Sequence, residues 1–286
     1  MIRQHAVTDR FKKSLRYSRV IEGWFSPNAA KMLSFMNQFQ IDSGIRGNFF
    51  EIGVHHGKMS VILGSLVNPD ERLGVCDLFG VQEENISHSG DGSLDHFLRH
   101  WDSLFPSRES LTVFSKNSNQ LSLEETSRNC RVFSIDGGHS SKETFDDLVL
   151  ASKATLQDGL IVLDDFFEPG FPGVAEGACR FFEAHPNFVP LLFVGGRMFI
   201  CQESAYAKYL GALQSDSFKW HCEKNRIYLQ WQTFYNRDFG IVRQFTYAQD
   251  FMRRLRSRFS REGLIFGIAQ KSGLLSLYRK LIQPKA

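Results

Sequence analysis

The 286-residue sequence has no apolar run that approaches the ~20 residues needed to cross a bilayer. Residues 1–19 are polar and basic, without the apolar segment and small-residue cleavage site of a secretory signal. The five cysteines are scattered and form no C-x-x-C pair, which argues against a cysteine-based zinc site. We therefore expect a cytoplasmic protein with reduced cysteines.

The composition is that of an ordinary folded protein, with 42% hydrophobic and 23% charged residues and no internal repeat. The net charge of +3 is uneven, because residues 250–286 carry nine Lys/Arg and two acidic residues. The rest of the chain is therefore slightly acidic and shows no base-stacking module, so we expect no nucleic-acid partner. The basic and partly apolar tail at 253–281 is typical of a helix face packed on the body or on a second copy. A peripheral contact with an anionic membrane or an acidic glycan is the alternative.

Short apolar runs alternate with helical patterns and predict an α/β fold with a doubly wound, mostly parallel sheet. A helical lead-in is expected at 1–46, and a C-terminal extension at 203–286. The region between, 47–202, is expected to hold the sheet. Predicted strands lie at 48–53, 72–77, 111–115, 131–136 and 160–164, followed by a hairpin at 188–201 and a further strand at 227–231. Segment 79–110 has no clear structure, which is typical of a lid or substrate loop, or of an idle surface loop.

Two predicted strands end in polar groups. Asp136-Gly137-Gly138-His139 follows one, and Asp164-Asp165 follows the other. Because open α/β sheets build their sites at the carboxyl ends of parallel strands, we expect these groups to share one crevice. Three carboxylates are hard to hold together without a cation, so a metal site with a histidine base beside it is predicted.

Other strand ends suggest a cofactor. Glu51-x-Gly53-x-x-x-Gly57 follows the first strand and opens a helix, where glycines let the backbone approach a ligand. The spacing differs from the G-x-G-x-x-G that seats a dinucleotide, which weakens a nicotinamide interpretation. Asp77 ends the second strand, in position to bind ribose hydroxyls. Asn117 and Ser118 end the third and can contact an adenine edge.

Residues 51–60, Glu-Ile-Gly-Val-His-His-Gly-Lys-Met-Ser, resemble the first motif of class I S-adenosylmethionine-dependent methyltransferases. The D-x-x-H and D-D combination resembles a narrower branch of metal-dependent O-methyltransferases, including those that act on macrolide sugars such as mycinamicin. The likeness covers about residues 22–202. It implies a Rossmann-like methyltransferase fold, a seven-stranded sheet whose last hairpin is antiparallel.

The resemblance also implies roles for individual residues. The general base would be His139. Mg²⁺ or Mn²⁺ would be held by Asp136, Asp164 and Asp165. S-adenosylmethionine would be bound by Glu51, Gly53, Gly57, Ser60, Asp77, Asn117, Ser118 and Asp136. One departure concerns the third strand, where the family commonly has Gly-Asp-Ser and this chain has Lys116-Asn117-Ser118.

Each assignment has a structural alternative. Asp136 could cap the next helix, although Ser140, with Glu143 three residues on, is the better-placed cap. Asp164 and Asp165 could form a solvated turn, and His139 could bind backbone. The paired histidines of the glycine loop could be metal ligands, but packing is the simpler account.

The predicted function is therefore S-adenosylmethionine-dependent, metal-assisted O-methylation of a hydroxyl on a sugar, glycan or natural product. A cation lowers the pKa of a bound hydroxyl, and a histidine, which titrates near neutral pH, takes the proton. One alternative is an NAD(P)-dependent oxidoreductase on the same sheet. The other is a cofactor-binding or membrane-associated protein without transfer activity. A homo-oligomer is compatible with all three.

Overall fold

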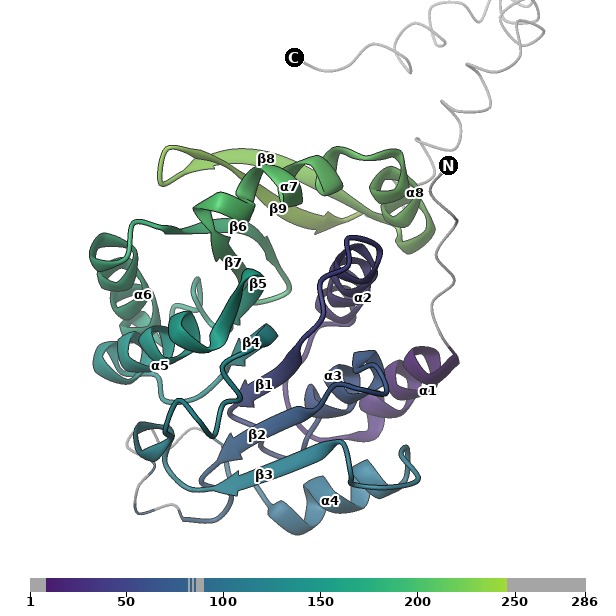
Figure 1. Ribbon diagram of the computed structural model, residues 1–286, viewed down its shortest axis with the longest axis vertical. Helices are drawn as coiled ribbons and strands as arrows, with labels where there is room; N and C mark the ends of the chain where they lie inside the picture. The colour runs from purple at the N-terminus through teal and green to yellow at the C-terminus, as the bar shows by residue number, and fades with distance from the viewer. Residues whose placement is uncertain (1–8, 82, 84, 86–89, 246–286) are drawn as a thin grey trace, which may run out of the picture.

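A single mixed sheet of nine strands forms the centre of the computed structural model, which describes residues 9–81, 83, 85 and 90–245 (Figure 1). The strand order is β3-β2-β1-β4-β5-β7-β6-β9-β8. The strands are β1 (Asn48–Ile52), β2 (Leu73–Asp77), β3 (Leu111–Ser115), β4 (Cys130–Ile135), β5 (Thr155–Leu163), β6 (Phe188–Val194), β7 (Arg197–Gln202), β8 (Ile227–Phe234) and β9 (Arg237–Gln244). The helices are α1 (Asp9–Tyr17), α2 (Pro27–Asp42), α3 (Ser60–Leu66), α4 (Leu94–Asp102), α5 (Ser141–Ala154), α6 (Pro172–Ala184), α7 (Glu203–Gln214) and α8 (Asp216–Asn225).

The first five strands are parallel. From β1 the chain adds β2 and β3 on one side, then crosses over and adds β4 and β5 on the other side. Strand β7 lies antiparallel to both β5 and β6. Gly195 and Gly196 form the β6–β7 turn, with φ values of 56° and 95° that favour glycine. The predicted doubly wound sheet and its antiparallel hairpin are both confirmed.

The predicted count of seven strands is wrong, because β8 and β9 extend the same sheet. Strand β9 pairs in parallel with β6 at Leu192↔Gly240 and Phe193↔Ile241, and β8 pairs antiparallel with β9. The strand expected at 227–231 is β8, whereas β9 has no sequence signal of its own. Its pattern is interrupted by Gly240, where a Cβ would lie 2.7 Å from a Leu229 methyl carbon. The side chain of Leu229 therefore packs directly against Gly240, in the space that a Cβ would need.

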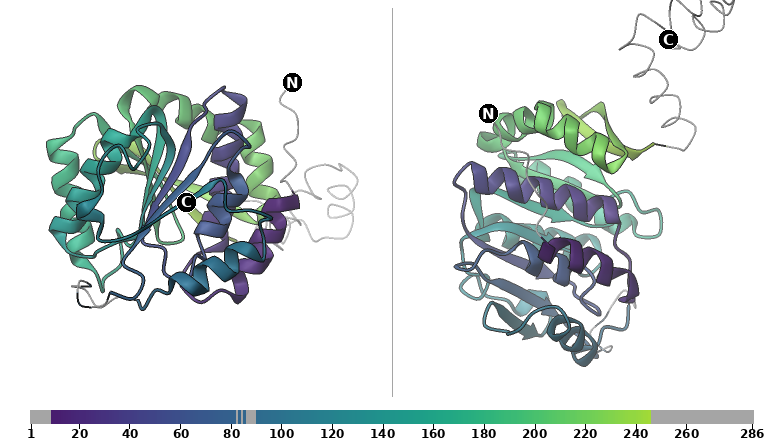
Figure 2. Two further views of the ribbon diagram at one scale, coloured as in Figure 1. Left: turned by 60° about the horizontal axis from the view of Figure 1, so that its bottom comes forward. Right: turned by 90° about the vertical axis from the view of Figure 1, so that its right-hand side faces the viewer.

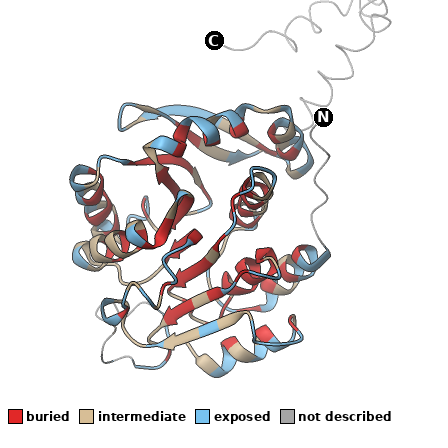
Figure 3. Ribbon diagram, in the orientation of Figure 1, coloured by how far each residue is buried: buried red, intermediate tan, exposed pale blue. Residues whose placement is uncertain are grey.

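The two faces of the sheet carry separate hydrophobic cores (Figures 1 and 2). One face is covered by residues of α1, α2, α3, α4, α7 and α8, and the other by residues of α5 and α6. The central strands are buried on both sides (Figure 3). Such strands read as continuous apolar runs, which explains why they were predictable.

Segment 79–110 is not structureless, because it contains α4. Ser93 caps this helix by accepting a hydrogen bond from the main chain of His96 at 3.4 Å, and Phe97 and Trp101 are buried. Leu94, Phe97, Leu98 and Trp101 have helical spacing, so the signal was present among the polar residues that surround it.

The start of β5 also differs from expectation, because this strand was predicted at 160–164 and begins at Thr155. Helix α5 begins with the predicted capping box, in which Ser140 and Glu143 bind each other's main chain. It ends at Ala154, however, and β5 starts at once with Thr155. Gly159 therefore lies inside a strand. A Cβ there would stand 2.9 Å from the carbonyl oxygen of Cys130, so close strand contact explains this glycine.

No helix among the described residues is long and apolar enough to cross a membrane. The basic tail at 253–281, for which a membrane or subunit contact was predicted, lies outside the described residues.

Candidate active site

A pocket of about 540 Å³ opens at the carboxyl edge of the parallel strands. It lies between the parallel strands β1 and β4, where the strand order reverses, the place at which open α/β sheets bind ligands. Most of the predicted site residues line it, namely Glu51, Gly53, Asp77, Asn117, Ser118, Asp136, His139, Asp164 and Asp165. Gly57 and Ser60 do not. The sheet thus gathers groups from five strand ends.

Gly53 is required by the close approach of β1 and β4. Its φ is 83°, and a Cβ would stand 1.8 Å from the carbonyl oxygen of Asp136. A glycine is needed at position 57 for a different reason, because a Cβ there would lie 2.3 Å from the ring of Phe97 on α4. The first glycine shapes the pocket floor, and the second seats α4 against the loop.

Asp77 organises the glycine loop. One carboxylate oxygen accepts main-chain hydrogen bonds from Val54 at 2.6 Å and His55 at 2.8 Å, and the other accepts one from Phe79 at 2.6 Å. A carboxylate has about four acceptor positions, so little capacity remains for ribose hydroxyls. Asp77 can therefore accept from one ribose hydroxyl at the remaining position, and a second hydroxyl requires that one of these bonds be shared.

Glu51 is a buried acid at the back of the pocket, 1% exposed. Burial raises its pKa to about 8, although the hydroxyl of Ser60, which donates a hydrogen bond at 2.5 Å, opposes the rise. Ser60 is itself fully buried, so its contact with the pocket is through Glu51.

The segment that follows β3 lies beside a second buried acid, Asp147 of α5. Asn117 uses its side-chain oxygen to cap the short 3₁₀ turn Ser118–Gln120, accepting from the main chain of Asn119 at 3.1 Å. Beneath it, burial raises the pKa of Asp147 on α5 to about 7, and a hydrogen bond from Ser118 opposes the rise. The sequence gives Asp147 no motif of its own, and only the packing of α5 brings it to this edge.

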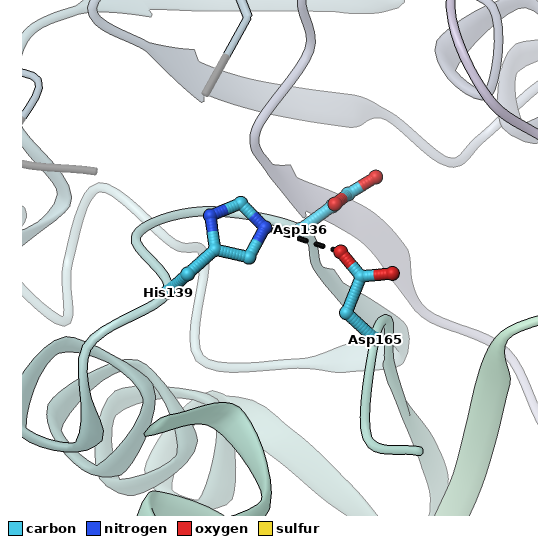
Figure 4. A group of neighbouring side chains, drawn as sticks. All are labelled: Asp136, His139 and Asp165. Carbon is cyan, nitrogen blue, oxygen red and sulfur yellow. Dashed lines mark hydrogen bonds and ion pairs between the residues drawn. The ribbon is translucent and has the colours of Figure 1, made fainter. Parts of the chain in front are cut away.

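Asp136, His139 and Asp165 form a close cluster of polar side chains, seen in Figure 4. One donor atom from each lies within 4.8 Å of the others. The Nε2 atom of His139 is 3.1 Å from a carboxylate oxygen of Asp165, and the imidazole stacks on Phe171 with ring centroids 3.9 Å apart. The φ of Asp165 is 59°, a left-handed conformation that costs about 1–2 kcal/mol. The contact between the Asp165 carboxylate and His139, which this turn makes possible, offsets that cost.

Asp164 takes a different partner. It is ion-paired with Arg197 of β7, which also reaches Asp136 at 3.1 Å. Burial, followed by the nearby charge of Asp164, raises the pKa of Asp136 well above its usual range, whereas Arg197 opposes the rise. No sequence motif marks Arg197, although it is a lone charge beside the apolar run Met198–Cys201 of the hairpin.

The segment 22–25, here called the rim strap, lies along one side of the pocket. Glu22, Gly23 and Trp24 line the pocket. The Lys58 ammonium donates to the Gly23 carbonyl at 2.7 Å, and the Phe25 ring lies 4.9 Å from the guanidinium carbon of Arg197. The strap is therefore fastened to both the glycine loop and the acidic cluster, and Trp24 remains 81% exposed between them.

The fold and the pocket define a Rossmann-like protein built like the S-adenosylmethionine-dependent methyltransferases. Residues 50–166 match the model of a family described as a methyltransferase domain. The matched segment contains the glycine loop, Asp77 and the Asp136, His139 and Asp165 cluster.

Several solved structures are similar to this chain at low sequence identity. The O-methyltransferase NovP is 16% identical, with a TM-score of 0.50, over 60% of this chain and 79% of that one. An O-methyltransferase from Bacillus cereus in complex with SAH is 16% identical, with a TM-score of 0.46, over 68% of this chain and 90% of that one. TomG, an O-methyltransferase from Streptomyces achromogenes in complex with SAM, is 14% identical, with a TM-score of 0.46, over 68% and 88%. No curated protein sequence matches the chain.

Proposed function

We propose that the protein is a metal-assisted O-methyltransferase that transfers the S-adenosylmethionine methyl group to a hydroxyl of a sugar, glycan or natural product. The observation that carries this proposal is the Asp136, His139 and Asp165 cluster, which lines the same pocket as the glycine loop. An acid–base pair beside a cofactor loop is the arrangement that methylation of a hydroxyl needs.

The charge of the pocket supports this cofactor over a nicotinamide. Eight carboxyl groups line it, from Glu22, Glu51, Asp77, Asp136, Glu143, Asp164, Asp165 and Glu168, and burial disfavours the charged form of two of them, Glu51 and Asp136. Three cationic side chains face them, from Lys58, Lys116 and Arg197. S-adenosylmethionine carries a positive sulfonium and a positive amino group against a single carboxylate, so its net charge is positive and such a pocket attracts it. The diphosphate of NAD(P) would be repelled.

The chemistry assigned to the cluster is a single displacement. The acceptor oxygen forms a bond to the methyl carbon as the bond from that carbon to sulfur breaks, and the sulfonium leaves as a neutral thioether. His139 takes the hydroxyl proton, and the adjacent Asp165 carboxylate stabilises the imidazolium that results. Alignment of the oxygen with the methyl carbon supplies much of the remaining rate.

Asp136 and Asp165 fit a divalent cation, because one carboxylate oxygen from each lies within 4.8 Å of the other and of a nitrogen of His139, which is left free to act as the base. Carboxylate-rich ligation favours Mg²⁺ or Mn²⁺, and a bound cation would lower the pKa of a coordinated hydroxyl. Asp164 joins this set only if its ion pair with Arg197 rearranges.

The rim strap supports a sugar acceptor. Trp24 offers an exposed aromatic face beside pocket carboxylates, and its ring lies 6.1 Å from that of His55. An aromatic face packs against the apolar face of a sugar ring, and carboxylates accept its hydroxyl hydrogens. This combination is typical of carbohydrate sites rather than of purely apolar ones.

We further propose that 47–202 is the cofactor-binding unit, 1–46 its helical lead-in and 203–286 an extension. The five cysteines form no disulfide, in keeping with a cytoplasmic location.

The first test is calorimetric titration with S-adenosylhomocysteine and, separately, with NADH. Binding of the first alone supports the proposal, whereas binding of NADH alone refutes it. Methyl transfer to a panel of sugars and glycosides is then followed by mass spectrometry, with and without EDTA. His139→Ala should lower turnover by about 10²–10⁴-fold and keep S-adenosylhomocysteine affinity. His185→Ala, at the end of α6, is the matched control and should change neither.

A further inference from the structure

Arg197 is a buried charge at the centre of the acidic pocket. Its side chain is 2% exposed, and it begins β7 directly after the Gly195-Gly196 turn. An arginine stays protonated in proteins, so burying it requires anionic partners. Here the partners are Asp136 and Asp164, the groups that follow β4 and β5.

The three carboxyl groups of the cluster have different partners. Asp165 contacts His139, and Asp164 is ion-paired with Arg197. Asp136 is also ion-paired with Arg197, but it lies close to Asp165 and His139 as well. The group with donor atoms close enough for one cation includes Asp136 and Asp165 but not Asp164. The guanidinium therefore takes up a carboxylate that a divalent cation would otherwise use.

The guanidinium is not fully satisfied by these contacts. Its Nε atom is buried and finds no hydrogen-bond partner among the described residues. A buried donor without an acceptor is costly, so this packing is not held as tightly as a complete network would be. The phenyl ring of Phe25 in the rim strap covers the guanidinium from another side.

We propose that Arg197 is a positioning residue that acts as a built-in counter-charge, competing with the divalent cation for Asp136 and Asp164. This rests on the cation part of the proposed function. The consequence is that the protein holds the acidic cluster together in the absence of a cation and binds Mg²⁺ or Mn²⁺ weakly. Without the guanidinium, three carboxylates would face a cation with no opposing charge.

The experiment measures Mn²⁺ binding to the full chain without cofactor, by electron paramagnetic resonance of free Mn²⁺ and by calorimetry. Arg197→Gln should bind Mn²⁺ at least tenfold more tightly than the natural protein. Arg197→Lys keeps the charge and should stay within threefold. The control is Arg237→Gln, which removes an arginine of β9 that pairs with Glu203 at 2.8 Å outside the cluster, and it should change nothing. Equal or weaker binding by folded Arg197→Gln, or no Mn²⁺ binding by any variant, overturns the proposal.

A second comparison covers the case in which Arg197→Gln does not fold. Because Asp164 is occupied by Arg197, Asp164→Asn should weaken Mn²⁺ binding less than Asp165→Asn does. Equal losses would show that both carboxylates serve the cation alike and would refute the inference. S-adenosylhomocysteine binding is measured on the same samples. Its absence alongside the predicted Mn²⁺ changes would count against the methyltransferase proposal only.

Discussion

Replacing Glu51 with glutamine should make the protein more stable at alkaline pH. The carboxyl group of Glu51 is 1% exposed, and its burial raises its pKa from 4.5 to about 8. In the unfolded chain the group ionises near its ordinary value. The folded state therefore holds a proton that the unfolded state has lost throughout this interval.

The raised pKa of Glu51 makes the free energy of unfolding depend on pH, because folding changes the number of protons bound. Below pH 4.5 both states are protonated, so Glu51 contributes nothing to the pH dependence. As pH rises to about 8, the unfolded state gains stability by ionising and the free energy of unfolding falls. The interval corresponds to a loss of about 5 kcal/mol at ~1.4 kcal/mol per pH unit. This is an upper value, because local relaxation or water entry reduces the cost of the charge.

The assay is urea unfolding of the natural protein and Glu51→Gln across about pH 5 to 9, without cofactor. The difference in free energy of unfolding between the two should grow with pH in favour of the variant and level off above about pH 8. Glu176→Gln makes the same change on the exposed face of α6 and should leave the pH profile unaltered. Parallel profiles for the natural protein and Glu51→Gln would refute the reasoning.

The same variant should bind S-adenosylhomocysteine less well. A glutamine cannot supply the negative charge that Glu51 acquires when it ionises on binding a cationic or hydroxyl-bearing ligand, and a hydrogen bond to a charged group contributes about 1.5–3 kcal/mol. We therefore expect a loss of about 10- to 150-fold in calorimetry. If Glu51 ionises to bind ligand, affinity should also rise as pH approaches 8 in the natural protein and not in the variant.

Three further predictions concern other parts of the pocket. Gly53→Ala should abolish S-adenosylhomocysteine binding and lower the unfolding midpoint, because the new Cβ would lie 1.8 Å from a main-chain oxygen beyond β4; retained binding would contradict this geometry. Asp165→Asn should reduce turnover at least tenfold, since His139 loses its anionic partner at 3.1 Å; unaltered turnover would remove Asp165 from proton transfer. Trp24→Ala should raise the KM for a sugar acceptor with little change in kcat or in cofactor affinity. Trp220→Ala, an exposed tryptophan on α8, is its control, and equal effects of the two would exclude Trp24 from acceptor binding.

The sequence predicts the strand ends because they are local features. Asp136 and Asp165 each follow a continuous apolar run, and parallel strands that are buried on both faces need such runs. The capping box at Ser140 is equally local, since Glu143 is three residues away. For this reason the arrangement of the pocket could be anticipated in outline.

What could not be predicted depends on contacts between distant residues. The partner of Asp164 is Arg197, which enters the pocket only because β7 turns back beside β5. Two of the three main-chain bonds to Asp77 depend on the glycine loop folding over β2, and the third comes from Phe79. Motif comparison treats these carboxylates as equivalent ligands, whereas their hydrogen-bond partners differ. Their roles are therefore decided by packing rather than by spacing.

The β8–β9 hairpin changes which strand forms the free edge of the sheet. A seven-stranded sheet would end at β6, whose residues are nearly all buried and apolar. Unpaired main-chain groups on such a strand attract other chains. With the hairpin in place the edge is β8, where residues 230–233 are exposed and mostly polar. A fragment that ends at β7 would expose the apolar edge and self-associate, so a minimal catalytic fragment of this chain should retain residues through 244.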